Sequence, residues 1–374
     1  MSEQAPSAFP RIAHLRYLAQ GLAPGRQDAT AFDAARRLLC TQGQHLGGVV
    51  AALALRSGGD AAAVEAAFDR GEIVRGYPMR GTVFAAPAED LQWMNALGGA
   101  RSVRSANRRR EQLGLSEPLL ERIEGEILDI LAGSERGALS RTEIAEALEA
   151  RGIPLEAPQR YHVFFTLIAL GRLVYGPLRG SEHLVVDAAS WLPETSTLEA
   201  RFNGDELAAI AEWLHRYLRG HGPATIRDFA WWTKLPLGRI RKAAEARPLE
   251  TELEGYGADP SGEALWGAPG LREAAAGVEE ELVAPRLLPP FDELLLGYGE
   301  RGAIVHEDHH RRIDPARNGV FKPVVYVDGR LIGTWSAKTS GRSRRFEFLP
   351  FEADAAGPAA AALEAVHADY PHRG

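Results

Sequence analysis

The chain has 374 residues, 45% of them hydrophobic and 25% charged, and its 43 Lys and Arg against 50 Asp and Glu leave a formal net charge of −7. This composition excludes wholesale disorder, and at roughly 100–200 residues per domain the length predicts two to four domains. No apolar run reaches the roughly 18 residues that a membrane-spanning helix needs. Cys40 is the only cysteine, which excludes an internal disulfide framework and predicts a reducing, cytoplasmic location. The start of the chain, residues 1–4, lacks the features of a signal peptide.

The net charge taken alone disfavours a nucleic-acid partner, but the charge is unevenly distributed along the chain. Residues 101–110 hold five arginines and no acid, and residues 311–350 are also basic. The acid is concentrated elsewhere, above all in residues 251–300. Concentrated basic segments can bind phosphates on one face of an acidic protein, although each of them can also be a solvated surface.

Residues 1–115 are expected to form the first of four domains. Apolar periodicity predicts helices over 11–20, 31–40 and 61–68, followed by strands over 73–75 and 82–85. The order of helices and then a strand pair is the pattern of a winged helix, the first of three copies.

Residues 116–196 carry the clearest copy. Helices are expected over 121–131, after Ser140 and over 158–172, and strands over 173–175 and 184–186. Ser140 with Glu143 three residues on forms a capping box, and Gly152 ends that helix. Three helices followed by a hairpin predict a winged helix.

Residues 197–285 form the third expected winged helix, with helices over 205–219, 226–233 and 237–246 and a strand over 249–253. Residues 286–374 are predicted to be rich in β-structure. Strands are expected over 294–298, 303–306, 324–327, 331–335 and 346–348, with a tight hairpin turn at Asp328-Gly329. The fold class is therefore mainly α with β wings (α+β). Tandem winged helices favour duplex DNA as the partner, although some copies of this fold mediate protein contacts or dimerisation.

The segment Gln42-Gly43-Gln44 follows directly after a helix and places two carboxamides two residues apart. On an extended backbone the side chains of residues i and i+2 point to the same side, and a glycine between them allows close backbone approach. Two such carboxamides can hold one water or one sugar oxygen between them. Spacing alone also fits two ordinary polar residues of a loop.

Five segments in this order resemble the winged-helix DNA glycosylases of the AlkZ/YcaQ type (the HTH_42 family), and the resemblance covers nearly the whole chain. They are Gln42-Gly43-Gln44; Met79-Arg80-Gly81-Thr82 with Pro87-Ala88-Glu89-Asp90; Tyr217-Leu218-Arg219-Gly220-His221-Gly222-Pro223-Ala224-Thr225; Asp228-Phe229-Ala230-Trp231-Trp232; and Leu288-Pro289-Pro290-Phe291-Asp292-Glu293-Leu294-Leu295-Leu296-Gly297-Tyr298.

The resemblance implies a C-shaped clamp of tandem winged helices around a basic channel, with a β-rich C-terminal part. It implies a monofunctional DNA glycosylase that excises N7-alkylated purines from double-stranded DNA and unhooks interstrand crosslinks, acting as a monomer without cofactor or metal. The family's motif is Gln-x-Gln in AlkZ-type members and Gln-x-Asp in YcaQ-type members, so Gln42 and Gln44 would be catalytic and AlkZ-like. Gly43 is smaller than the usual middle residue and is expected to loosen both glutamines, and His45 stands where an acid is more usual.

Basic residues near these segments are the candidates for phosphate contacts in the channel. His306-Glu307-Asp308-His309-His310 has metal-ligand residue types, but it is predicted to be a turn between strands that faces solvent or DNA. Trp213, Trp231 and Trp232 are assigned to the core, and Asp292 and Glu293 are interpreted as structural. The candidate DNA-binding residues are Arg80, Arg101, Arg104, Arg108, Arg109, Arg110, Arg179, Lys234, Arg239, Arg241, His309, Arg311 and Arg312.

Two other functions remain open at this point. A non-catalytic winged-helix transcriptional regulator would dimerise and prefer a DNA sequence, whereas the enzyme would be monomeric and selective for damage. A self-resistance protein would bind one genotoxin adduct tightly and turn it over poorly.

Overall fold

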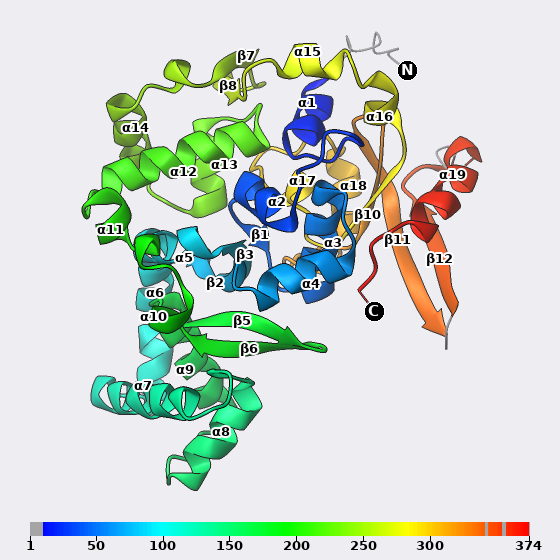
Figure 1. The fold of residues 1–374 in the computed structure, drawn as a ribbon. Coiled ribbons are helices and arrows are strands. Elements are labelled where there is room, and N and C mark those ends of the chain that lie inside the picture. Colours follow the sequence, from blue (N-terminus) through cyan, green and yellow to red (C-terminus); the bar gives the residue numbers. More distant parts are fainter. Residues whose placement is uncertain (1–9, 341–342, 354–356, 374) are drawn as a thin grey trace.

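The computed structural model describes residues 10–340, 343–353 and 357–373 (Figure 1). Residues 1–4, on which the prediction about a signal peptide depends, lie outside this range. No helix in the described ranges is both long and apolar enough to cross a membrane. The first elements are α1 (Ile12–Ala19), α2 (Ala31–Leu38), β1 (Thr41–Gln42), α3 (Leu46–Ser57), α4 (Ala61–Asp69) and the hairpin of β2 (Ile73–Met79) and β3 (Thr82–Pro87).

Side-chain caps explain where the helices of this first region begin. Thr30 accepts a hydrogen bond from the Asp33 amide at the start of α2, and Asp60 does the same for the Ala63 amide at the start of α4. The predicted helices and strands of this region are present, and α3 is an additional helix that the sequence interpretation did not include.

The second region has the predicted order of three helices and a hairpin. Ser140 and Glu143 form the predicted capping box, in which the Ser140 amide donates to Glu143 Oε2 at 2.7 Å. Figure 1 shows this region at the bottom of the view, away from the C-terminal strands. The elements of this region are α7 (Glu117–Ala132), β4 (Ala138–Leu139), α8 (Arg141–Ala150), α9 (Ala157–Ala169), β5 (Leu173–Arg179) and β6 (Glu182–Asp187). Before it, within residues 1–115, lie α5 (Ala88–Met94), a π-helical turn (Asn95–Gly99) and α6 (Ala100–Gln112), which the sequence interpretation did not include either.

The first two hairpins belong to one sheet, which the sequence did not predict. The strand order is β1-β3-β2-β5-β6-β4, and β2 pairs antiparallel with β5 where Arg75 faces Tyr175. The two predicted copies therefore share backbone hydrogen bonds. The domain bounds 1–115, 116–196, 197–285 and 286–374 stay a prediction, as does the clamp shape.

The third region confirms the three predicted helices but corrects one strand. Residues 249–253, predicted as a strand, form a 3-10 turn (Leu249–Thr251), and the Leu253 amide donates to the Leu249 carbonyl at 3.0 Å. Leu249 and Leu253 are both buried at this helical spacing, which the strand interpretation overlooked. The elements are α10 (Ala188–Trp191), a 3-10 turn (Glu194–Ser196), α11 (Leu198–Phe202), α12 (Glu206–His221), α13 (Ile226–Thr233), α14 (Leu237–Ala246), β7 (Glu254–Ala258) and β8 (Ala264–Gly267).

The C-terminal region contains a four-stranded sheet in the order β12-β11-β10-β9, with the predicted Asp328-Gly329 turn between β10 and β11. Two predicted strands are wrong. Residues 294–298 belong mostly to helix α17, because Asp292 caps the Leu294 amide, and residues 303–306 are an irregular turn. The elements are α15 (Leu271–Ala275), α16 (Glu279–Val283), β9 (Arg286–Leu288), α17 (Glu293–Leu296), α18 (Glu307–Ile313), β10 (Val324–Val327), β11 (Arg330–Ser340), β12 (Ser343–Pro350) and α19 (Gly357–Ala368).

The N-terminal helix packs into the C-terminal core rather than only into its own region. Leu15 and Leu18 of α1 share a hydrophobic cluster with Leu288 and Leu294, and Tyr17 stacks on Tyr326 with ring centroids 4.4 Å apart. This packing joins the N-terminal helix and the C-terminal region in one hydrophobic core.

Candidate active site and DNA-binding groove

The two glutamines of the Gln-Gly-Gln segment contact each other at the end of β1. Gln42 Nε2 donates to Gln44 Oε1, and the Gln44 amide donates to Gln42 Oε1 at 2.8 Å. Gln42 is buried, with 6% of its surface exposed, whereas Gln44 is exposed. The predicted pairing of the two carboxamides is therefore present, and one of them faces solvent.

The backbone of Gly43 is held from two directions. Its amide donates to the Val83 carbonyl at 2.8 Å, and the Arg75 guanidinium donates to its carbonyl. A Cβ at this position would lie 3.0 Å from the Val83 oxygen and 3.2 Å from Arg75 Nε. The expected loosening by Gly43 is therefore not what these contacts indicate, because the turn is anchored and a side chain would crowd it.

Arg75 is a buried cation beneath this turn. Its Nη1 lies 2.7 Å from His183 Nδ1, and His183 Nε2 lies 2.7 Å from the Gly176 carbonyl. Burial lowers the pKa of Arg75 to about 10. Burial and the neighbouring Arg75 lower the pKa of His183, so the imidazole is neutral, accepting at Nδ1 and donating from Nε2. A lone arginine in an otherwise apolar strand was the sequence signal for this residue, and it was missed.

Two buried carboxylates lie at the start of α17, and one of them holds the segment from the C-terminal side. Glu293 Oε1 accepts from the Gln42 amide at 3.0 Å, and its Oε2 accepts from Trp232 Nε1 at 3.0 Å. Asp292 pairs with Arg56 through contacts of 2.8 and 2.9 Å, and both side chains are fully buried. Both acids are structural as expected, but the sequence did not indicate that Glu293 anchors the backbone of Gln42.

His45 begins helix α3 and borders a cavity beside the glutamines. Its Nδ1 accepts from the Gly48 amide at 2.9 Å, which makes it the N-cap residue. The adjoining cavity has a volume of about 480 Å³ and is lined by His45, Phe291, Phe321, Trp335 and Tyr370, among others. This volume falls within the range of pockets that bind small molecules.

Five of the predicted DNA-binding residues line one groove of about 550 Å³, here called the basic groove: Arg80, Arg101, Arg104, Lys234 and Arg239. They come from the turn between β2 and β3, from α6, from the C-cap of α13 and from α14, so segments far apart in the sequence meet there. Arg101 Nη1 donates to the Lys234 carbonyl at 3.1 Å. Among the residues that the structure describes, no Asp or Glu lines the groove, and Arg239 is the one of these five that forms an ion pair, with Glu206.

The structure places the other predicted arginines elsewhere. Arg108 and Arg109 are exposed on α6, and Arg241 is exposed on α14. Arg110 is buried and pairs with Glu117 at 2.6 Å, so its charge is already neutralised. Arg179 pairs with Glu143, and this contact lowers the pKa of Glu143 to about 2.

Residues 306–310 form a helix rather than the predicted turn between strands. His306 caps α18, His309 contacts Glu352 at 2.7 Å, and Arg312 donates to the Pro350 carbonyl at 2.7 Å. Arg311 is exposed. Within the described ranges no three His, Cys, Asp or Glu side chains are grouped as metal ligands.

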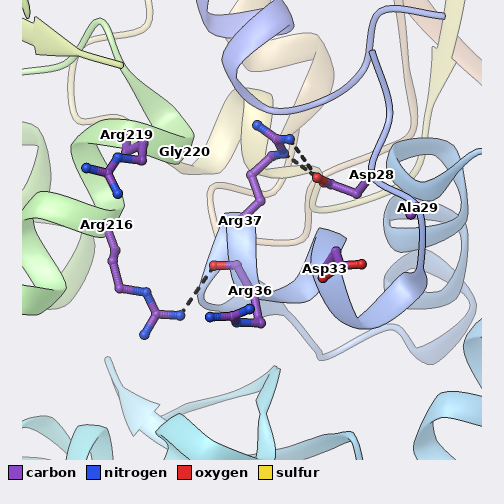
Figure 2. Close-up of a pocket in the computed structure, with 8 residues that line it drawn as sticks. All are labelled: Asp28, Ala29, Asp33, Arg36, Arg37, Arg216, Arg219 and Gly220. Carbon is purple, nitrogen blue, oxygen red and sulfur yellow. Dashed lines mark hydrogen bonds and ion pairs between the residues drawn. The ribbon is translucent and has the colours of Figure 1, made fainter. Parts of the chain in front are cut away.

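A second pocket is also rich in arginine but differs in its partners. Figure 2 shows Arg36, Arg37, Arg216 and Arg219 around it, with Arg37 meeting Asp28 and Arg216 reaching the backbone of Arg36. Each arginine pairs with a carboxylate: Arg37 with Asp28, Arg216 with Asp90, Arg36 with Glu89 and Arg219 with Glu252. We call this region the paired-arginine pocket.

Comparison with known proteins agrees with the resemblance. The family described as DNA glycosylase AlkZ-like matches residues 35–372. A curated relative, the interstrand DNA cross-link repair glycosylase of Streptomyces sahachiroi, is 28% identical over 288 residues, which cover 70% of each chain. The solved structure of the Streptomyces sahachiroi DNA glycosylase AlkZ has the same fold, with a TM-score of 0.71 at 23% identity over 98% of this chain and 97% of that one. This chain therefore belongs to the AlkZ-like DNA glycosylase family, and it is a DNA glycosylase.

Proposed function

We propose that this enzyme hydrolyses the N-glycosidic bond of N7-alkylated purines in double-stranded DNA, with Gln42 and Gln44 as its catalytic residues. The observation that carries the proposal is the contact between the two carboxamides beside an open face of the protein. One of the pair is exposed, so it can meet a substrate, and the other is held by Glu293.

The chemistry suits side chains that do not titrate near neutral pH. An N7-alkylguanine is already cationic, so the bond from C1′ to N9 can break with its electron pair passing to the base, without prior protonation. The water oxygen then bonds to C1′ and releases a proton to solvent. A carboxamide both donates and accepts hydrogen bonds, so the two glutamines can orient this water and stabilise the positively charged sugar.

The basic groove supports double-stranded DNA as the substrate, because cationic side chains without acidic partners suit backbone phosphates. The relative from Streptomyces sahachiroi is named for interstrand cross-link repair, and on this basis we extend the proposal to the unhooking of such crosslinks. A crosslinked base cannot easily be flipped into a closed pocket, so the proposal includes an open clamp that acts as a monomer. The single buried Cys40 favours action in the cytoplasm.

The decisive measurement is base release from duplex DNA that contains 7-methylguanine or an azinomycin-type crosslink, under single-turnover conditions. Replacing both residues, Gln42→Ala with Gln44→Ala, is expected to slow release roughly 100-fold or more. Gln112→Ala, an exposed glutamine at the end of α6, is the matched control and should leave the rate unchanged.

Three other outcomes would contradict the proposal. Wild-type rates in the double variant would show that the glutamines are not catalytic. Sequence-selective binding by a dimer, with no base release from either lesion, would instead identify a regulator. Tight lesion binding with very slow turnover would identify a self-resistance protein.

A further inference from the structure

Three cationic side chains surround the ring of Trp231. The guanidinium carbons of Arg80 and Arg301 lie 4.8 and 4.9 Å from its ring centroid, and Lys234 Nζ lies 4.7 Å from it. A single tryptophan with one cation is a common arrangement in proteins, whereas three cations on one ring concentrate positive charge in a small volume. We call these four residues the Trp231 cluster.

Among the described residues, carboxylates act on the cluster only from beyond ion-pair distance: Glu293 opposes the lowering of the Arg80 pKa, and Asp314 and Glu300 oppose that of Arg301. In the part of the chain that the structure describes, Arg80, Lys234 and Arg301 form no ion pair, and Arg80 Nη1 is buried without a hydrogen-bond partner. Burial lowers the pKa of all three side chains, and Arg80 further lowers the pKa values of Lys234 and Arg301 by repulsion. An anion placed among them would remove this repulsion.

The surrounding structure holds the cluster in place before any ligand arrives. Arg301 Nε donates to the Leu295 carbonyl at 2.9 Å, and its Nη1 lies 2.8 Å from His310 Nε2. The Gly299 backbone packs on the indole, since a Cβ there would lie 3.1 Å from Trp231 Cγ. The side chains therefore have little freedom to lose when they bind.

The cluster borders the basic groove and is connected to the glutamines through Glu293. Arg80 and Lys234 line the groove, and Lys234 is exposed, so the cluster can be reached from it. Trp231 is followed in α13 by Trp232, which donates to Glu293, and Glu293 accepts from the Gln42 amide. One buried carboxylate thus connects the helix that carries the cluster to the backbone of the proposed catalytic residue.

We infer that the Trp231 cluster binds a single backbone phosphate beside the damaged nucleotide and so positions its sugar over Gln42 and Gln44. This inference rests on the proposed function. It makes Arg80, Lys234 and Arg301 positioning residues, and it adds Arg301 and Trp231 to the groove residues that sequence had indicated. A backbone phosphodiester carries one negative charge shared by two non-bridging oxygens, and each oxygen can accept more than one hydrogen bond, which suits three converging cationic donors.

The test replaces one phosphate at a time by a neutral methylphosphonate around a single 7-methylguanine, and measures release with saturating enzyme. One position should slow the wild-type enzyme tenfold or more. The same position should slow Lys234→Gln by less than twofold, because the partner of that phosphate is already missing. Lys234 is exposed, so this variant is expected to fold, and Arg80→Gln repeats the test from the other side of the ring.

Arg104→Gln is the matched control, since Arg104 lies in the same groove but does not contact Trp231. The methylphosphonate at that position should slow base release by Arg104→Gln by the same factor as it slows release by the wild-type enzyme. A free phosphate ion in the cluster would give no dependence on position in the DNA. If the methylphosphonate slows Lys234→Gln and Arg80→Gln as much as it slows the wild-type enzyme, at every position, the inference is overturned.

The two proposals fail in different ways. If wild-type enzyme releases no base, the proposed function fails. The same combinations of methylphosphonate position and protein variant are then compared by their affinity for a duplex with an abasic-site analogue, which forms a double-mutant cycle. Coupling between one phosphate and Lys234 in that binding cycle would still support the cluster, and additivity would still overturn it.

Discussion

Two arginine-rich regions of this protein differ in what their arginines contact. In the paired-arginine pocket every guanidinium meets a carboxylate, at distances between 2.6 and 3.1 Å. In the basic groove Arg80, Arg101, Arg104 and Lys234 form no ion pair within the described residues. Both regions are hollowed surfaces of similar composition, so a count of arginines does not distinguish them.

The difference shows which cations remain available to a ligand. A guanidinium that already faces a carboxylate must give up that contact before it can bind a phosphate, whereas an unpaired one gains a partner. We therefore expect the paired-arginine pocket to stabilise the fold and the basic groove to bind DNA. The following experiments test this comparison.

The largest effect is expected at Asp90, which is fully buried and accepts hydrogen bonds from Arg201, Arg216 and Trp93. Asp90→Asn keeps the shape but leaves two guanidinium groups without a countercharge, and should lower the free energy of unfolding by about 3–5 kcal/mol. Urea titration measures this loss. Glu89→Gln, which breaks the exposed pair with Arg36, should cost about 1 kcal/mol or less. Equal costs for the two variants would contradict a structural role for this pocket.

Within the basic groove, the double variant Arg101→Gln with Arg104→Gln should weaken DNA binding without lowering stability. Each lost phosphate contact reduces the slope of log binding constant against log salt concentration by roughly 0.9. The difference in DNA affinity between wild type and variant should therefore narrow about tenfold between 50 and 200 mM salt. Fluorescence anisotropy with an undamaged duplex measures the DNA affinity at each salt concentration. The same change at Arg36 and Arg219 should leave DNA affinity as it is, and a similar loss there would break the comparison.

Arg75 offers a third arrangement, in which a buried cation faces a neutral imidazole. Because the pKa of His183 is lowered in the folded state, the unfolded state binds more protons below its ordinary value of 6.5. Stability should therefore be constant above this pH and fall below it, by at most about 1.4 kcal/mol per pH unit. His183→Gln should remove this part of the slope in thermal unfolding between pH 5 and 7. An unchanged slope would mean that other groups cause it.

The smallest effect is expected from freeing one arginine. Glu206→Gln removes the ion-pair partner of Arg239 in the basic groove. It should raise DNA affinity by roughly threefold or less, because one exposed ion pair contributes little. Glu89→Gln frees Arg36 in the other pocket and should not change affinity. Higher DNA affinity in both variants would indicate that the overall charge of the protein, rather than a defined groove, determines DNA binding.

Much of the local structure could be predicted from the sequence. The capping box of Ser140 and Glu143, the turn at Asp328-Gly329 and most helices are present, because their hydrogen bonds join residues close in the chain. Apolar runs were less informative. Residues 249–253 and 294–298 were assigned to strands, and the cap of Asp292 and the helical spacing of Leu249 and Leu253 show turns or helix instead.

The candidate site could be predicted only in part. The spacing of Gln42 and Gln44 indicated that their side chains lie close together, since only Gly43 separates the two residues in the chain. The anchors of this segment could not be predicted in the same way. Arg75 and Glu293 reach it from positions 32 and 251 residues away from their partners, so their contacts depend on how β2 and α17 pack.

The sequence by itself determined the family, the glutamine pair and a surplus of arginine in certain segments. It did not determine which arginines are neutralised, because an ion pair such as Arg216 with Asp90 joins residues 126 positions apart. Only the tertiary structure gathered Arg80, Lys234 and Arg301 around Trp231, and among the described residues it gave none of the three an ion-pair partner. The physical reason is that charge acts over a few ångströms in space, whatever the separation along the chain.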